Sequence, residues 1–406
     1  MKFLIVVTKM IFDLRHIRKL LFFIALVLHC VIGGAIAFSG VISYRPFYVS
    51  LLILLLIVIY KIRIDNVLKF HIVFGIIIII SGCLNGSSFG NIISALRLPI
   101  FSQTMYLVVY GFLDKENYSL EWLLKSIALV QLPVVLFQMI FFSVLSDLSA
   151  IHTSYLDIRY GTFFVKSDSL MSTFLILLVI YLLYVKREFS RYNIMVIVTS
   201  CITIFLADSR ISQISILGIV AYYVLVSSTI KQKIGFLVLV FVIFMSFFFT
   251  GYTNKLSNQF ADTLEQITFQ KGVSQRRFEE GEYARAAAIL YFMSEPLKIF
   301  GDGPGKYVNP ITGEMELGLQ SQYLKSYAET GLVGMVLSIV GVFVIVLSLL
   351  GRGFYRYLVI LTIIALGVTS DLYNDSGLMF IVFLFLNVIS KEEVQQEGLH
   401  NIEIQS

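Results

Sequence analysis

Long apolar runs recur along this chain and constrain its fold more than any other feature. Hydrophobic residues make up 58% of the 406 residues, charged residues make up only 14%, and the mean hydropathy is +0.86. A soluble domain carries roughly a quarter charged residues, and a fold in water could not hide this much apolar surface. The composition therefore predicts an all-α polytopic membrane protein.

About twelve runs are candidates for bilayer-spanning helices, each of which needs about 20 mostly apolar residues. The second and seventh are short, and the fourth carries Arg97 and Pro99, which makes it a candidate for a broken helix. The predicted spans are residues 20–38, 46–60, 68–84, 92–112, 122–146, 167–185, 193–207, 211–228, 233–250, 322–350, 354–370 and 374–390.

The distribution of Lys and Arg predicts how these spans are oriented. Basic residues precede the first span and recur in alternate loops, as expected if those loops face the cytoplasm. Twelve spans then place both termini inside and the loop of residues 251–321 outside. "AIA" at 35–37 resembles a signal-peptide cleavage site, but the many later spans favour a retained first helix.

This orientation divides the chain into four parts. Residues 1–250 hold spans one to nine, 251–321 form the large external loop, 322–390 hold the last three spans, and 391–406 form a cytoplasmic tail. The loop contains "EEGEYARAAAILYFM", whose apolar spacing predicts one or two helices on the outer face. Loops this long usually carry function.

Several kinds of site are excluded by residue type and spacing. The three cysteines form no CxxC pair, and the five histidines form no cluster with metal-ligand spacing, so we expect no metal. The net charge of +5 is spread over many short loops and gives no reason to expect nucleic acid as a partner.

The stretch "IFGDGPGKY", residues 299–307, looks like a phosphate-binding loop. A Walker A loop needs GxxxxGK followed by Ser or Thr, but Phe300 stands at the first glycine position and Tyr307 follows the lysine. The dinucleotide pattern GxGxxG fails as well, because Lys306 replaces its third glycine. We interpret the stretch, which includes Gly303, as a tight turn that leads the chain back to the membrane.

Arginines on the predicted outer side depart from the orientation trend. Guanidinium binds phosphate oxygens through paired hydrogen bonds and stays charged, so a cluster beside the membrane suggests a lipid-linked phosphate ligand. The alternative is that each arginine extends to the lipid headgroups. These residues are Arg159, Arg210, Arg276, Arg277 and Arg285.

The chain re-enters the membrane through "GLQSQYLKSYAETGLVG", residues 318–334. This start of a span is unusually polar and includes Gln320, Tyr323 and Glu329. A carboxylate two turns into a span is costly unless it is paired. The alternative to a functional role is that Glu329 pairs with Lys325 at the i,i+4 spacing.

Four stretches in this order resemble the O-antigen polymerase and O-antigen ligase superfamily. They are "RYGTFF" before a span, "DSR" at a later span lip, "EPLKIFGDGPG" after the large loop, and "SQYLKSYAETGLVG". The superfamily consists of bacterial inner-membrane glycosyltransferases with ten to fourteen spans, a GT-C-like helical architecture and one large periplasmic loop.

The resemblance implies a substrate and a location. Family members act on glycan repeat units carried by undecaprenyl pyrophosphate, at the outer face of the cytoplasmic membrane. The pyrophosphate linkage already activates the donor, so neither metal nor cofactor is implied. A chain-length regulator (co-polymerase) is implied as a partner beside the lipid bilayer and the lipid-linked glycan of O-antigen, capsule or exopolysaccharide.

The resemblance also implies roles for named residues. Arg210 matches the family arginine at the span lip, and either the pair Arg276/Arg277 or Arg285 matches the loop arginine, so these would stabilise the leaving pyrophosphate. Glu329 completes the catalytic candidates. The substrate-binding candidates are Arg159, Arg276, Asp208, Gln320, Tyr323 and Gly303.

One departure favours a polymerase over a ligase. Ligases carry a histidine, taken as general base, where this chain has Gln320, and glutamine accepts no proton at neutral pH. The general base is left open among carboxylates that could take a hydroxyl proton, and a transferase without a strong base is a further alternative. The carboxylates are Asp208, Glu282, Asp302 and Glu329. A lipid-linked glycan transporter is the alternative of another class, although the two halves show no repeat.

Overall fold

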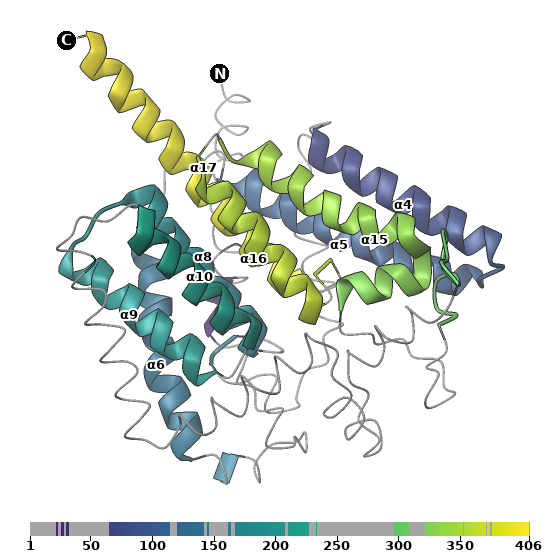
Figure 1. The fold of residues 1–406 in the computed structure, drawn as a ribbon, viewed down its shortest axis with the longest axis horizontal. Coiled ribbons are helices and arrows are strands. Elements are labelled where there is room, and N and C mark those ends of the chain that lie inside the picture. Colours follow the sequence, from purple (N-terminus) through teal and green to yellow (C-terminus); the bar gives the residue numbers. More distant parts are fainter. Residues whose placement is uncertain are drawn as a thin grey trace, which may run out of the picture.

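The chain is a bundle of α-helices in the computed structural model (Figure 1). Apart from a few isolated residues, the structure describes residues 65–113, 120–141, 144–145, 161–163, 167–207, 210–226, 296–307, 321–351, 353–370, 372–373 and 376–405. Within these ranges the ordered elements are helical and none is a strand. The predicted spans 46–60 and 233–250, and most of 20–38, lie outside the described residues.

The first group of helices contains α4 (Asn66–Leu84), α5 (Phe89–Leu113) and α15 (Gln322–Leu349). The side chain of Asp65 caps α4 by accepting a hydrogen bond from the Leu68 amide at 2.9 Å. Helix α4 packs against both of the others, and the three helices lie side by side on one flank of Figure 1.

Helix α5 runs unbroken through Arg97 and Pro99, so the expectation of a broken span is wrong. A proline removes one backbone hydrogen bond, and helices in a bundle tolerate this loss when neighbours accommodate the ring. The neighbour here is Gly75 of α4, where a Cβ would lie 3.9 Å from Pro99 and 3.5 Å from Leu96. These are ordinary van der Waals distances, so the two helix faces pack against one another at the proline without a clash.

The centre of the bundle is built from α8 (Ser167–Ile180), the π-helical turn η3 (Tyr181–Lys186), α16 (Tyr355–Thr369) and α17 (Ser376–Gln405). Every side chain from Leu170 to Val185 is buried, as expected for a helix that is apolar all round.

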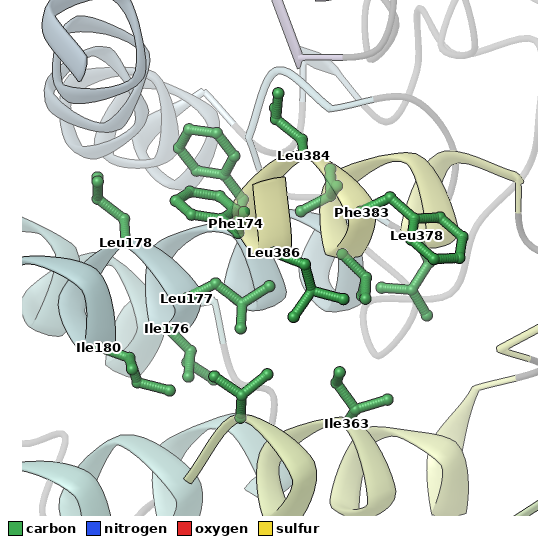
Figure 2. Packing of buried hydrophobic residues seen from close by; sticks show 14 of the residues in the cluster. Phe174, Ile176, Leu177, Leu178, Ile180, Ile363, Leu378, Phe383, Leu384 and Leu386 are labelled. Carbon is green, nitrogen blue, oxygen red and sulfur yellow. The ribbon is translucent and has the colours of Figure 1, made fainter. Parts of the chain in front are cut away.

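Figure 2 shows how this centre is packed. Phe174 of α8 meets Phe385 of α17 edge to face, with ring centroids 5.3 Å apart. The labelled side chains come from α8 (Phe174, Ile176, Leu177, Leu178 and Ile180), α16 (Ile363) and α17 (Leu378, Phe383, Leu384 and Leu386).

The remaining helices are α6 (Glu121–Ile140), α9 (Arg191–Leu206) and α10 (Arg210–Val226). Helix α6 packs on α9, whereas α10 packs on α8 and α16. The Ser190 side chain caps α9 by accepting a hydrogen bond from the Asn193 amide at 3.2 Å.

The helix lengths are consistent with a polytopic membrane protein. Among the described residues, four helices are long and apolar enough to cross a bilayer: Asn66–Leu84, Phe89–Tyr110, Glu121–Ile140 and Gln322–Leu349. Four further apolar helices are shorter. The total of twelve spans stays a prediction. Helix α17 continues to Gln405, so the predicted tail extends the helix of the last span.

An ion-pair network joins three helices at one end of the bundle. The Lys186 ammonium lies 3.2 Å from Glu392 of α17 and 3.5 Å from Glu121 of α6. Glu121 also pairs with Lys125, and the Tyr181 hydroxyl lies 3.3 Å from both glutamates. The sequence predicts that all these segments lie on the cytoplasmic side.

The same end holds the C-terminal end of α15, because the Gly351 amide donates to the Glu393 carboxylate at 2.9 Å. The N-terminal end of α15 therefore lies at the opposite end of the bundle. Helix α9 leaves the Lys186 end through residues 187–190, so α10 begins at that opposite end too. The sequence predicts this second end to be the outer one.

Replacing Lys186 by Met tests the network. The change leaves two half-buried carboxylates facing one another, so we expect the free energy of unfolding to fall by about 1–2 kcal/mol. Thermal unfolding of the purified protein in detergent would measure the loss. Arg191→Met, which removes an exposed cation at the same end, is the matched control. Equal unfolding temperatures for the two variants would contradict a stabilising network.

Candidate functional site

Three segments far apart in the sequence meet at the predicted outer end of the bundle. They are the turn between α4 and α5, residues 296–307, and the first turns of α15. We call residues 296–307 the glycine loop. It lies beside the ends of α4 and α15 in Figure 1.

Helix α15 is broken at Gly331. The backbone there has φ 72° and ψ −162°, far from helical values, so residues 322–330 and 332–349 form two half-helices. A break interrupts the helical bonds that cross it and leaves amides on one side and carbonyls on the other without helical partners. Such groups need other partners wherever lipid replaces water.

The glycine loop supplies acceptors to the second half-helix. The Leu332 amide donates to the Lys298 carbonyl at 2.9 Å, and the Val333 amide donates to the Ile299 carbonyl at 3.3 Å. These two amides are the first donors after the break. The loop backbone therefore takes the place of the missing helical turn.

The glycine loop also supplies donors to the first half-helix. The Asp302 amide donates to the Ala328 carbonyl at 2.8 Å, and the Gly303 amide donates to the Glu329 carbonyl at 3.1 Å. The loop thus bonds to both sides of the break. This explains the glycine stretch better than a simple return turn does, because the turn completes a broken helix.

Two glycines permit this close approach. Gly301 has φ +69°, and a Cβ there would lie 2.6 Å from the Gly331 nitrogen and 2.7 Å from the Ala328 oxygen. A Cβ at Gly331 would lie 2.3 Å from the Ile299 oxygen. Backbone atoms cannot move aside as a flexible side chain can, so both positions require glycine.

The end of α4 holds the loop against α15. The buried Ser81 hydroxyl lies 2.6 Å from the carbonyl oxygens of both Phe300 and Glu329, which share its single hydrogen. The side-chain amide of Asn85 donates to the Ser81 carbonyl at 2.9 Å and to the Phe300 carbonyl at 3.4 Å. Sequence reasoning missed both residues. Their signal was a polar pair, four residues apart, at the end of an isoleucine run.

The charged groups of the loop are engaged within it or with α4. The Lys298 ammonium lies 2.8 and 3.0 Å from the two carboxylate oxygens of Asp302. The Lys306 ammonium donates to the Asn85 carbonyl at the end of α4, where a cation is favourable. Asp302 is therefore a weaker candidate for the general base than the sequence alone indicates, because both its oxygens hold a cation.

Tyr323 faces the rest of the bundle through its hydroxyl, which donates to the Ile364 carbonyl of α16 at 3.0 Å. Its predicted role in substrate binding stays a prediction. Its neighbour Gln322 is fully buried and accepts from the Tyr373 amide at 3.3 Å. These bonds fix the first half-helix on the connection between α16 and α17.

Tyr373 joins the connection between α16 and α17 to α15. Its hydroxyl donates to the carbonyl of Ser338, which lies in the second half-helix, after the break at Gly331. The distance is 2.9 Å. Burial, reinforced by Tyr323, raises the pKa of the Tyr373 hydroxyl well above its usual range. The hydroxyl therefore stays protonated and serves as a structural donor.

Part of the "RYGTFF" stretch is held by two glutamines of α6. The Gly161 amide donates to the Gln138 side chain at 2.7 Å, and the Thr162 amide donates to the Gln131 side chain at 3.0 Å. Both glutamines also donate back, Gln138 to the Gly161 carbonyl and Gln131 to the Thr162 hydroxyl. The backbone just after the "RY" pair is thus fixed on the bundle.

The structure tests few of the predicted site residues directly. Gly303 and the half-buried Glu329 meet at the break, and Arg210 is the first residue of α10, although its side chain is not described. The others lie outside the described residues, and their roles stay predictions: Arg159, Asp208, Arg276, Arg277, Glu282, Arg285 and Gln320.

Part of the chain matches a known family. Residues 195–339 match the family described as O-antigen ligase. This match supports membership of the O-antigen polymerase and ligase superfamily. The matched region includes α9, α10, the glycine loop and the break in α15. Members of this superfamily are glycosyltransferase-like membrane enzymes. No curated protein matches the chain.

Replacing Gly301 by Ala tests whether the glycine loop packs directly on the backbone of α15 at the break. The side chain would enter a left-handed backbone and press on the α15 backbone, so we expect a loss of at least about 2 kcal/mol in the free energy of unfolding. Gly218→Ala is the matched control, because a Cβ there meets nothing within 4 Å. Thermal unfolding in detergent would separate the two, and a Gly301→Ala protein as stable as wild type would contradict the close approach.

Proposed function

We propose that this chain is a repeat-unit polymerase of the Wzy type. It would transfer a growing glycan from undecaprenyl pyrophosphate to a new lipid-linked repeat unit at the outer face of the cytoplasmic membrane. Membership of the superfamily supports a lipid-linked glycan as substrate. The observation that favours polymerisation over ligation is Gln320, which stands where the ligase resemblance places a histidine base.

The reaction breaks the bond between the donor's anomeric carbon and its phosphate oxygen. A hydroxyl of the acceptor unit forms the new glycosidic bond and loses its proton, and the pyrophosphate leaves with the bonding electron pair. Negative charge grows on the leaving group, so guanidinium groups aimed at it would supply the largest stabilisation. Arg210 and either Arg277 or Arg285 are the residues proposed for this role.

The acceptor hydroxyl needs a group that takes its proton. We assign this role to Glu329, because the loop bonds fix the backbone of this half-buried carboxylate residue at the break. Arg159, Arg276 and Asp208 are proposed to hold donor or acceptor phosphates and sugars. Gln320, Tyr323 and Gly303 are proposed to line the acceptor side.

Ligation to lipid A-core is the second candidate, since the matched family carries the description O-antigen ligase. A lipid-linked glycan transporter is the candidate of another class. The three functions differ in what accumulates when the chain is missing, so one experiment separates them.

The first test is a surface-glycan gel from a strain that lacks this chain. Loss of polymerisation leaves a single repeat unit on the surface acceptor, and restoring the gene returns the ladder. Long lipid-linked chains without attachment would indicate a ligase instead. Repeat units trapped on the cytoplasmic side would indicate a transporter.

Arginine variants in the restored strain test the proposed chemistry. We expect Arg210→Ala and Arg277→Ala to lower polymer formation about 10²- to 10³-fold, as for loss of a preorganised charge donor. Arg210→Lys should also be poor, because lysine lacks the forked geometry.

The matched control is Arg191→Ala, an arginine at the other end of the bundle. Immunoblots of membranes would show that each variant is present at the wild-type level. Full-length polymer from both Arg210→Ala and Arg277→Ala would contradict the assignment.

A further inference from the structure

We propose that Ser81 is a positioning residue of the transfer site, which it serves by fixing the backbone of Glu329 at the break in α15. The proposal rests on the proposed function, because it takes Glu329 as the group that accepts the acceptor's proton. It concerns a residue in a span that lies outside the matched region 195–339.

The hydrogen bonds of Ser81 leave its own helix. A serine or threonine inside a helix usually bonds a carbonyl three or four residues earlier. Thr104 bonds Ile100, and Ser338 bonds Met335, in this way. The Ser81 hydroxyl instead reaches Phe300 of the glycine loop and Glu329 of α15, 2.6 Å from each carbonyl oxygen.

One acceptor, Phe300, belongs to the glycine loop, and the other, Glu329, belongs to the first half-helix of α15. These are the two segments that bond to one another at the break. The Glu329 carbonyl accepts a hydrogen bond from the Gly303 amide at 3.1 Å, and it shares the single hydrogen of Ser81 with the Phe300 carbonyl. Ser81 is fully buried, so water does not take over when the hydroxyl is removed. Loss of the hydroxyl therefore loosens the contact between the loop and the first half-helix at the residue that carries the carboxylate.

A small shift at this point has a large effect on transfer. Ser81 contacts the backbone carbonyl of Glu329, the residue whose side chain carries the carboxylate. Two residues later, Gly331 has a non-helical backbone. No continuous helix fixes the position of Glu329 from that side. Misplacement of a reacting group by about 1 Å can cost about 10²-fold in rate.

The test uses the full chain purified in lipid nanodiscs, with lipid extracted from the deletion strain as the source of lipid-linked single units. We expect Ser81→Ala to lower the transfer rate about 10- to 100-fold, and Ser81→Thr, which keeps the hydroxyl, to recover most of it. Ser338→Ala is the matched control, because this buried hydroxyl donates to the Met335 carbonyl in its own helix turn. It should transfer at the wild-type rate.

The pH dependence separates positioning from general stability. Glu329→Gln should be slow and should lose the fall in rate at acid pH, because its amide does not titrate. Ser81→Ala should shift the acid midpoint of the pH profile, whereas a merely less stable protein would lower the rate equally at every pH. Size-exclusion profiles give the amount of folded protein for each variant.

Two results with Ser81→Ala would overturn the inference. One is a wild-type rate for Ser81→Ala, and the other is a loss that matches the loss of folded protein with an unchanged pH profile. Failure of the proposed function looks different, because the wild-type chain itself would then form no polymer from extracted single units. A wild-type rate for Glu329→Gln would reject the base assignment and, with it, the role of Ser81.

Discussion

Backbone hydrogen bonding at the break in α15 is the interaction on which the rest of this end of the molecule depends. Lipid offers no partners to amides and carbonyls, so a broken helix is stable only where protein replaces the missing bonds. The glycine loop does this with four backbone bonds, two on each side of the break. A stretch that looks like a nucleotide loop is in fact a structural partner of a distant helix.

This arrangement links the predicted external loop, residues 251–321, to the helix bundle. The glycine loop lies within that segment and is bonded to Ala328, Glu329, Leu332 and Val333 of α15. Ser81 and Asn85 extend the same contact to α4. The opposite end is fixed differently, by side-chain charges of Glu121, Lys186 and Glu392. One end is therefore held by backbone geometry and the other by ion pairs.

Hydropathy alone predicted most of the described helices, because an apolar run of sufficient length has few other stable forms in lipid. It did not predict that α5 would pass through Pro99 unbroken, because a helix packed in a bundle can tolerate the backbone hydrogen bond that a proline removes. Nor did it predict the break at Gly331, because the bonds that complete the break come from a separate segment, residues 296–307. Ser81 escaped notice for the same reason, because its partners Phe300 and Glu329 lie more than 200 residues away in the chain.

The position of the break suits chemistry on a lipid-linked substrate. A pyrophosphate carried by a membrane lipid lies near the headgroups, so a residue that acts beside it must lie at a span end rather than in an aqueous domain. A carboxylate in a continuous span is costly to keep there. At the break, the glycine loop and Ser81 of α4 both bond the Glu329 carbonyl, so two other segments fix the backbone of this half-buried residue.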